Sequence, residues 1–317
     1  MIRLLLTNHQ APGDILMLTA AVRDLHAAFP GRYQTAVQTS APELWDNNPH
    51  VTPLHELAKP YRAIQCGYPL VQQSNHAAMH FIHGFAQHLG WRLGVSIPIR
   101  RFAADIHLSD EERRSRSPVE ANGPYWIIVA GGKYDFTTKW WDPAAYQAVV
   151  NQFAGRLTFV QCGQEGHWHP PLDGVISMVG KTSIREFVRL MHHADGVVCP
   201  VTFAMHLAAA VPLRPGQLSR PCIVIAGGRE PPTWEMYPGH QFLHTVGALD
   251  CCAGGGCWKS RCQRVGDGDT KDQDLCVQPV RVSPHLHIAR CMTMVKPGRV
   301  IDAIELHLCG ERAALRK

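Results

Sequence analysis

The residues best suited to chemistry in the second half of the chain follow an apolar strand. Residues 194–212 contain a β-branched run that ends at a Cys-Pro pair, then Thr202 and a small-residue helix with His206 near its start. Thr is a common N-cap residue, and the free backbone N–H groups of a helix start attract phosphate. The segment therefore predicts a buried strand feeding a capped helix, with Thr202 and His206 beside an anion. An ordinary strand–helix unit with a solvated His fits the same residues.

A carboxylate occupies an equivalent place near the N-terminus. An apolar strand over residues 1–7 is followed by Pro12, Gly13 and Asp14, and apolar residues then recur with helical spacing at positions 15, 18, 22 and 25. Gly13 permits a tight turn, which puts Asp14 in the first turn of a helix. Open α/β sheets bind ligands at this carboxyl edge of their strands. Helix N-capping is the simpler explanation for Asp14.

Both segments belong to a chain in which strands alternate with helices. In the first half we predict strands over 3–7, 34–39 and 62–66, and helices over 14–28, 42–47 and 75–90. In the second half we predict strands over 125–130, 157–162, 175–179, 196–199 and 222–226, and helices over 143–153, 183–193 and 203–211. This alternation is typical of parallel sheets with right-handed crossovers. The expected fold class is α/β, with two Rossmann-like domains facing a cleft.

The boundary between the two domains follows from a charged, turn-rich stretch. We interpret residues 109–124 as the interdomain linker, although one exposed helix would have the same composition. The N-terminal domain then covers residues 1–120 and the C-terminal domain residues 121–296. The latter includes a Gly- and Cys-rich segment, residues 250–296, with almost no periodicity; it is called the Cys-rich segment below. Residues 297–317 hold a final helix, predicted over 297–309.

Composition excludes several function classes. The chain has 317 residues, 45% of them hydrophobic and 18% charged, which argues against disorder. A net charge of +5 suits an anionic substrate, but no basic run interleaved with aromatics points to nucleic acid. The apolar start is too short for a secretory signal, and no stretch is long enough for a transmembrane segment. We expect a cytoplasmic protein, which a lipid-linked acceptor would bring to the inner membrane face.

The ordered set of motifs resembles glycosyltransferase family 9, the ADP-heptose:lipopolysaccharide heptosyltransferases. The N-terminal strand, Gly13-Asp14 and the following helix are similar to the opening of that family. Val201–Ala209 (VTFAMHLAA) is similar to its Asp-Thr-Gly-x-x-His-Leu-Ala-Ala motif. Three further segments agree in order: Thr137–Pro143, Gly163–Glu165 and Gly180–Glu186.

The resemblance implies a GT-B fold and an inverting transfer of heptose or a related sugar from an ADP-linked donor. The acceptor would be a saccharide, a lipopolysaccharide-type glycolipid or a protein, bound by the N-terminal domain. The family motif has Asp and Gly where this chain has Val201 and Phe203, and in the family that Asp helps to hold the donor's sugar hydroxyls. A catalytically inactive or regulatory nucleotide-sugar-binding protein is therefore the alternative. A sugar-nucleotide epimerase would share the architecture but needs more acidic and basic groups around the sugar.

Sugar transfer needs a base for the acceptor hydroxyl and positive charge for the departing diphosphate. Asp14 is the candidate base, as the matching Asp is in the family. Thr137, Thr138 and Lys139 follow a strand-ending Gly-Gly loop and offer two hydroxyls and an ammonium to the diphosphate without a catalytic metal. Thr202, His206 and the backbone N–H groups of 203–206 would face the same phosphates. Trp140 and Trp141 are assigned to packing.

The nucleoside is expected at three further polar residues. Glu165 follows a predicted strand and can accept both ribose hydroxyls, with Gln164 as the rival. Thr182 and Ser183 precede the next helix and are placed to meet the base. Ser183 and Glu186 also have the spacing of a capping box.

Cysteines crowd into the Cys-rich segment, which has too little apolar content to fold by burial alone. We predict a structural metal held by four thiolates, Cys257, Cys262, Cys276 and Cys291, with Cys251 or Cys252 as substitutes. Zinc is the default ion and iron the runner-up; a subset of the resembled family carries Cys-bound iron. Disulfides or free thiols are the alternative. Four other cysteines lie in predicted apolar strands and are expected to be small buried hydrophobes: Cys66, Cys162, Cys199 and Cys222.

Overall fold

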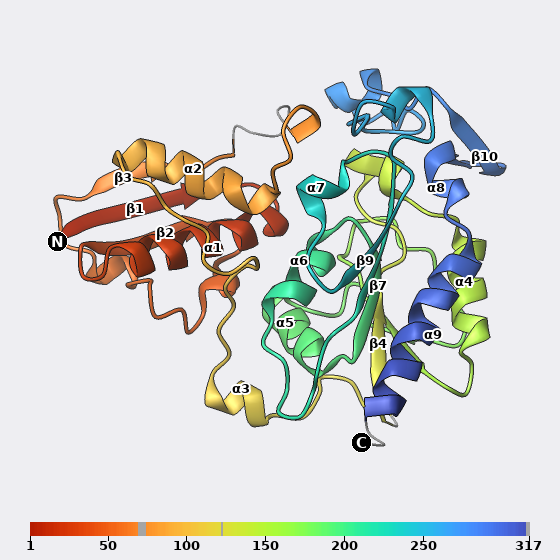
Figure 1. Cartoon of the computed structure of the whole chain (residues 1–317), viewed down its shortest axis with the longest axis horizontal. Coiled ribbons are helices and arrows are strands. Elements are labelled where there is room, and N and C mark those ends of the chain that lie inside the picture. Colours follow the sequence, from red (N-terminus) through yellow and green to blue (C-terminus); the bar gives the residue numbers. More distant parts are fainter. Residues whose placement is uncertain (69–73, 122, 315–317) are drawn as a thin grey trace.

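The computed structural model describes residues 1–68, 74–121 and 123–314 and shows two α/β lobes side by side (Figure 1). The N-terminal lobe has a three-stranded parallel sheet of order β2-β1-β3. Its elements are β1 (Ile2–Asn8), β2 (Tyr33–Thr39), β3 (Arg62–Gln65), α1 (Pro12–Ala28) and α2 (Phe81–Leu93). The three predicted strands of this lobe are therefore present.

Helix α1 is the structural centre of the N-terminal lobe. Its residues from Ile15 to Val22 are all buried, so the helix is covered on every side. It packs against α2 of its own lobe and against α6 (Phe203–Ala210) of the other lobe. A helix that is apolar all round belongs in such an interior position. The packing fixes the start of α1, and hence Asp14, at the boundary between the lobes.

The C-terminal lobe has a six-stranded parallel sheet of order β6-β5-β4-β7-β8-β9. The strands are β4 (Tyr125–Ile128), β5 (Thr158–Gln161), β6 (Ile176–Ser177), β7 (Gly196–Pro200), β8 (Cys222–Gly227) and β9 (His240–His244). The helices with it are α4 (Pro143–Gln152), α5 (Ile184–His193), α6, α7 (Pro232–Glu235) and α9 (Pro297–Ala314). In chain order this is the strand arrangement of dinucleotide-binding folds, whose ligands bind where the order reverses. Here that point is the crevice after β4 and β7.

Several element boundaries differ from the sequence predictions. Helix α2 begins at Phe81, six residues later than predicted, because His80 caps it by accepting a hydrogen bond from the Ile82 N–H at 3.1 Å. The helix predicted over 42–47 is a 3₁₀ turn, Pro42–Trp45. The stretch predicted as a linker contains a short helix, α3 (Asp110–Arg114), which covers only its start, so it is not one exposed helix; residue 122 lies outside the described residues.

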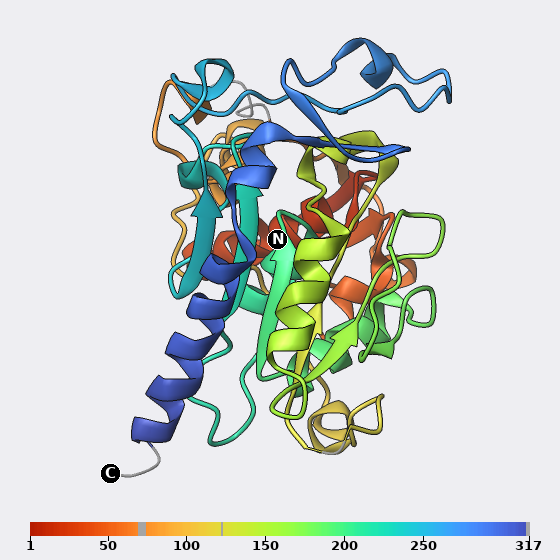
Figure 2. The same ribbon diagram turned by 90° about the vertical axis from the view of Figure 1, so that its right-hand side faces the viewer.

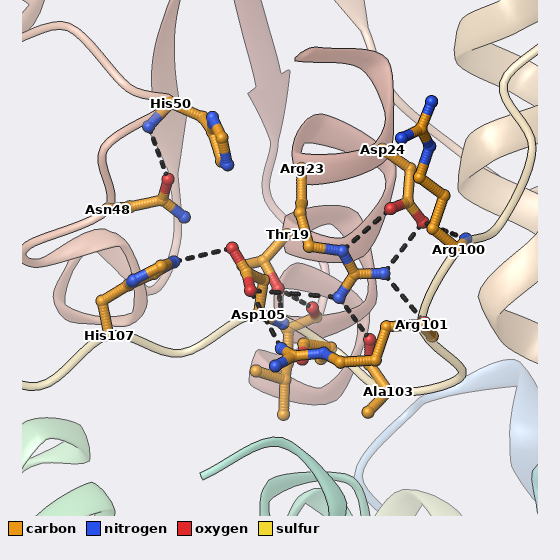
Figure 3. A network of polar contacts seen from close by, with 12 residues as sticks. Thr19, Arg23, Asp24, Asn48, His50, Arg100, Arg101, Ala103, Asp105 and His107 are labelled. Atoms are coloured by element: carbon orange, nitrogen blue, oxygen red, sulfur yellow. Dashed lines mark hydrogen bonds and ion pairs between the residues drawn. The ribbon is translucent and has the colours of Figure 1, made fainter. Parts of the chain in front are cut away.

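A polar network attaches the chain leaving the N-terminal lobe to α1 (Figure 3). The Arg23 guanidinium donates to the Ala103 carbonyl at 2.8 Å and pairs with Asp24 at 2.8 Å. The Asp105 N–H donates to the buried Thr19 hydroxyl at 2.8 Å, and the Asp105 carboxylate meets His107 at 2.7 Å. These contacts therefore fix the residues just before the linker against α1.

The Arg185 side chain connects the linker to the C-terminal lobe. Arg185, in the first turn of α5, pairs with Glu112 of α3 at 2.5 Å. Its guanidinium also donates to the carbonyls of His107 at 2.7 Å and Glu43 at 3.4 Å. Arg185 thus connects α5, the linker and the N-terminal lobe.

The Cys-rich segment is more ordered than its sequence suggests and stands at one end of the C-terminal lobe (Figure 2). It contains two 3₁₀ turns, the hairpin β10 (Pro279–Ser283) and β11 (Leu286–Ala289), and α8 (Arg290–Met294). Its centre is a fully buried guanidinium, Arg261, which pairs with Asp267 at 2.8 Å and Asp272 at 2.5 Å. This charge pairing adds to apolar burial, since Ile288, Ala289 and Met292 of the segment belong to the hydrophobic cluster of the C-terminal lobe. The segment leads into α9, which packs on α4 and β8. Among the described helices, none has the length and hydropathy to cross a bilayer.

Candidate active site

A cleft of about 990 Å³ lies between the lobes, beside the ends of β4 and β7. The N-terminal lobe contributes the start of α1 and Tyr68, and the C-terminal lobe contributes the loops after β4, β5, β7 and β8. The loop after β4 begins with Gly131 and Gly132, both at positive φ. A side chain at Gly131 would lie 2.0 Å from the Trp168 carbonyl oxygen, so only glycine fits. Two glycines thus form part of the wall at the strand-order reversal.

Asp14 lines this cleft and is half-buried. It is the third residue of α1 and not the N-cap residue, which is Ala11; its Oδ2 accepts the Ala11 N–H at 3.0 Å, so it supports the helix start from inside the first turn. The Tyr68 hydroxyl also donates to this carboxylate. Burial raises the pKa of Asp14, while Tyr68, Ala11 and the ammonium groups of Lys133 and Lys139 oppose that rise. Asp14 therefore supports the helix start and still lines the cleft, as a carboxylate with a raised pKa. Gly13 forms no tight turn: it lies inside α1, where an added methyl would lie 3.5 Å from His206 Cδ2.

Lys139 reaches the same cleft from the C-terminal lobe. Its Nζ lies 2.8 Å from Glu230 Oε1, and the Arg229 guanidinium pairs with the same oxygen. The Glu230 side chain is only 5% exposed, yet the two cations hold its pKa below the usual value. One ionised carboxylate is therefore shared by two cations at the floor of the cleft.

Thr202 and the N-terminus of α6 face the cleft as predicted, but the capping is different. Thr202 is the N-cap residue of α6, and its hydroxyl makes no capping hydrogen bond. That hydroxyl oxygen is buried and has no hydrogen-bond partner among the described residues. Val201 and Phe203 also line the cleft. An unbonded hydroxyl beside a helix N-terminus is free to donate to an anion.

His206 lines the cleft but its ring nitrogens face the interior. Nδ1 lies 2.8 Å from the Tyr237 hydroxyl, and Nε2 lies 3.2 Å from Glu235 Oε2. Burial lowers the pKa of His206 far below its usual value and raises that of Glu235 far above. A neutral imidazole with both nitrogens directed inward is not placed to donate to a phosphate in the cleft. That expectation is corrected here.

Thr137 and Thr138 are also placed differently from the prediction. Both are buried, and neither lines the cleft. The Thr137 hydroxyl accepts the Cys262 N–H at 2.8 Å, and the Thr138 hydroxyl donates to the Lys259 carbonyl at 2.7 Å. These hydroxyls attach the Cys-rich segment to the lobe, because the 3₁₀ turn Tyr134–Lys139 directs Phe136 and Lys139, and neither threonine, toward the cleft. Trp140, assigned to packing, is 5% exposed and does line the cleft.

The predicted nucleoside contacts lie at the rim. Glu165, its rival Gln164, Thr182 and Ser183 all line the cleft, and Glu165 and Ser183 are exposed. Ser183 caps α5 by accepting the Glu186 N–H at 3.1 Å, and the Glu186 carboxylate accepts the Ser183 N–H at 2.8 Å. The predicted capping box is confirmed. Glu165 remains available to a ligand at the end of β5.

Cysteines of the Cys-rich segment gather beside the turn after β8. A side chain at Gly228 would lie 3.0 Å from Cys252 Sγ, and one at Gly227 would lie 3.4 Å from Cys291 Sγ. The thiols of Cys262 and Cys276 are hydrogen-bonded to each other. Within the described residues, no three His, Cys, Asp or Glu side chains converge closely enough to hold an ion. All eleven cysteines are free thiols, and the four predicted to be small buried hydrophobes are indeed buried.

Comparison with known proteins decides the family. The sequence profile described as glycosyltransferase family 9 (heptosyltransferase) matches residues 58–215, about half of the chain. The chain belongs to glycosyltransferase family 9. It is an enzyme of that family, and no curated protein sequence matches it closely.

Solved structures of family 9 enzymes share the fold. A glycosyltransferase family 9 structure from Veillonella parvula matches with a TM-score of 0.65 at 12% identity, covering 98% of this chain and 97% of that one. Escherichia coli ADP-heptose LPS heptosyltransferase II matches with a TM-score of 0.61 at 13% identity, covering 98% and 100%. The iron-containing dodecameric glycosyltransferase TibC from enterotoxigenic E. coli matches with a TM-score of 0.61 at 17% identity, covering 97% and 76%. The chain therefore has the GT-B fold of heptosyltransferases, as expected from the motifs.

Sequence reasoning missed part of this family 9 cleft. Tyr68 was not singled out because nothing local marks a tyrosine that meets a carboxylate 54 positions away in the chain. Arg229 and Glu230 follow a Gly-Gly pair after β8, at the same sheet edge as Thr202. That position already indicates that both side chains could reach the cleft, since parallel strands present their following loops together, but the sequence assigned them no role. Trp258 reaches the cleft from the Cys-rich segment, whose fold has no periodic pattern.

Proposed function

We propose that this family 9 enzyme is an inverting glycosyltransferase that moves heptose or a related sugar from an ADP-linked donor to a saccharide of the lipopolysaccharide type. The observation that carries the proposal is the pairing of Asp14 and Lys139 across one cleft. The E. coli relative acts on ADP-heptose, and a TibC structure contains ADP-D-β-D-heptose. The strand-order reversal after β4 and β7 supports a nucleotide at the C-terminal lobe.

The proposed reaction is a single displacement. Asp14 accepts the proton of the acceptor hydroxyl, and the acceptor oxygen forms a bond to the anomeric carbon of the sugar. The bond from that carbon to the diphosphate oxygen breaks, and its electron pair leaves with ADP. The raised pKa of Asp14 suits a base that works near neutral pH. Lys139, the Thr202 hydroxyl and the N-terminus of α6 stabilise the charge that develops on the diphosphate.

The nucleoside would lie against the rim. Glu165 is proposed to accept hydrogen bonds from the ribose hydroxyls, with Thr182 and Ser183 beside the base. Val201 supplies no carboxylate for the sugar, so the sugar hydroxyls need another partner in this chain. The donor sugar is therefore the most informative variable in an assay.

Calorimetry with ADP and turnover of ADP-sugars, each with the parent and Asp14→Asn, test this proposal. We expect both proteins to bind ADP and only the parent to release it from a donor in the presence of an acceptor. ADP binding without turnover by the parent, across heptose donors and lipopolysaccharide core acceptors, would support an inactive nucleotide-sugar-binding protein instead. An Asp14→Asn variant that transfers normally would exclude Asp14 as the base.

We also propose that the Cys-rich segment holds a structural metal. The donor set fits in its chemistry, since Cys257, Cys262, Cys276 and Cys291 supply four soft thiolates that suit zinc or iron. It fits only in part in its geometry, because the thiols gather beside β8 without converging. The iron-containing relative TibC supports the idea. Such a metal would fix the segment that Thr137 and Thr138 attach to the lobe.

Metal analysis of the purified protein tests this assignment directly. We expect one zinc or iron per chain, and loss of that metal together with a lower melting temperature in Cys276→Ser. Cys309→Ser, at an exposed cysteine of α9, is the matched control. A parent protein without bound metal, purified without chelator, would refute the metal and leave free thiols or disulfides.

A further inference from the structure

Among the described residues, Glu230 is the one whose carboxylate contacts the Lys139 ammonium. It lies three residues beyond β8, at the floor of the cleft, with its side chain 5% exposed. Its Oε1 lies 2.8 Å from Lys139 Nζ. Two cations keep it ionised in a buried place, where an unpaired carboxylate would be costly.

Lys139 depends on this contact for its orientation. Its side chain is 20% exposed and has four rotatable bonds. Besides Glu230, the described structure offers its ammonium only the face of Phe136, with 5.5 Å between Nζ and the ring centroid. Without the carboxylate, the ammonium would be free to leave the floor of the cleft for solvent.

Arg229 connects Glu230 to the Cys-rich segment. Its Nε donates to the Lys259 carbonyl at 2.8 Å, and its guanidinium lies over the Phe136 ring at 4.6 Å and the Trp258 ring at 5.6 Å. A side chain at Gly256 would lie 2.4 Å from the Arg229 carbonyl oxygen, so the segment packs directly on this turn. Arg229 lines the cleft, and the segment holds its guanidinium there through the Lys259 carbonyl and the Trp258 ring.

The N-terminal lobe holds the same part of the segment. Asn75 Oδ1 accepts the Trp258 indole N–H at 2.9 Å and the Gly256 N–H at 3.0 Å. Trp258 has a φ of 57°, which is unusual for a residue other than glycine. Its backbone is thus fixed by contacts from both lobes, which gives Arg229 a rigid support.

We propose that Glu230 is a positioning residue for the Lys139 ammonium, and that the Cys-rich segment sustains this role by holding Arg229. The role rests on the proposed function, in which Lys139 stabilises the departing diphosphate. Glu230 directs the ammonium toward the leaving oxygen, and Arg229 compensates the carboxylate so that the group keeps a net positive charge. The segment acts on turnover through these two side chains, besides placing Trp258 in the wall of the cleft.

The test is a double-mutant cycle between Glu230→Gln and Lys139→Met, measured as donor kcat and KM and as ADP affinity by calorimetry. Glu230→Gln keeps the shape of the side chain and leaves the site one positive charge richer. We expect kcat to fall on the order of 10²-fold, as for a displaced catalytic group, while ADP binds at least as tightly as to the parent. In the Lys139→Met background, Glu230→Gln should cause no further loss. Glu230→Asp, which restores the charge, should recover part of kcat.

Glu305→Gln is the matched control. Glu305 lies on α9, does not line the cleft, and forms a surface ion pair with Arg156. We expect parental kcat and KM from it. Parental kcat in Glu230→Gln, or independent losses in the double mutant, would overturn the positioning role. Melting temperatures and active-site titration separate a loss of folded protein from a loss of turnover. If Glu230→Gln has the parental kcat per active site, the positioning role is also overturned. A parent that binds no ADP would instead sink the proposed function.

Discussion

The floor and the rim of the cleft hold their polar side chains in opposite ways. On the floor, Glu230 is buried and Asp14 half-buried, and both are bonded to neighbours and shifted in pKa, in opposite directions. On the rim, Glu165 and Ser183 are exposed, and Ser183 uses its hydroxyl to cap its own helix. Charges interact strongly where water is scarce, whereas exposed groups contribute mainly the hydrogen bonds that a ligand offers them. We therefore expect floor substitutions to change turnover and rim substitutions to change donor affinity.

The largest effect is expected for Asp14→Asn. The amide cannot accept the acceptor proton, so kcat should fall on the order of 10²- to 10⁴-fold, the contribution of a general base. ADP affinity should stay within a few-fold of the parent. Steady-state kinetics and calorimetry measure the two quantities. Asp110→Asn, at a first-turn acid of the exposed helix α3, is the control and should behave as the parent.

Lys139→Met should come next. Loss of the ammonium removes charge stabilisation of the diphosphate, with a kcat loss on the order of 10²-fold, the usual size for one electrostatic group. The same change removes a cation that lowers the pKa of Asp14, so that pKa should rise. A base works only when deprotonated, so the acid limb of kcat/KM against pH should move to higher pH. An unmoved limb would mean that the two groups are not coupled.

Glu165→Gln should raise the donor KM with little change in kcat. The lost hydrogen bonds to the ribose come from a charged acceptor at an exposed site, which corresponds to about tenfold in affinity. Gln164→Ala is the matched comparison. If Gln164→Ala raises KM and Glu165→Gln does not, the rival residue makes the contact.

Tyr68→Phe should have the smallest effect on kcat, and it tests most directly how the neighbours of Asp14 set its pKa. The Tyr68 hydroxyl favours the charged form of Asp14, so its removal should raise the pKa of Asp14. Activity should then be lost at a higher pH on acidification, with kcat at alkaline pH close to that of the parent. A pH–rate profile measures this shift. A profile that coincides with the parent's would assign the limb to a group other than Asp14.

The strands of the two sheets other than β9 could be read from the sequence, because their apolar runs and turn residues are local. Strand β9 was missed, since three of its five residues are polar. The β1–α1 start placed Asp14 at a sheet edge, and the spacing of Ser183 and Glu186 gave a true cap. Thr137 and Thr138 could not be placed, since one 3₁₀ turn decides which side chain enters the cleft. Glu230 and Tyr68 depend on contacts between distant segments. The hairpin β10–β11 could not be predicted either. It belongs to the segment that contains the buried Arg261, and the sequence of that segment shows no hydrophobic periodicity.

Arg185 has a consequence for how substrates exchange. A swing of the lobes about α3 must move Glu112 and two backbone carbonyls away from a single guanidinium whose side chain is 13% exposed. These bonds break together, because they share one planar group. Because the Arg185–Glu112 contact is an ion pair, dissolved salt weakens it, and we expect product release to quicken as the salt concentration rises.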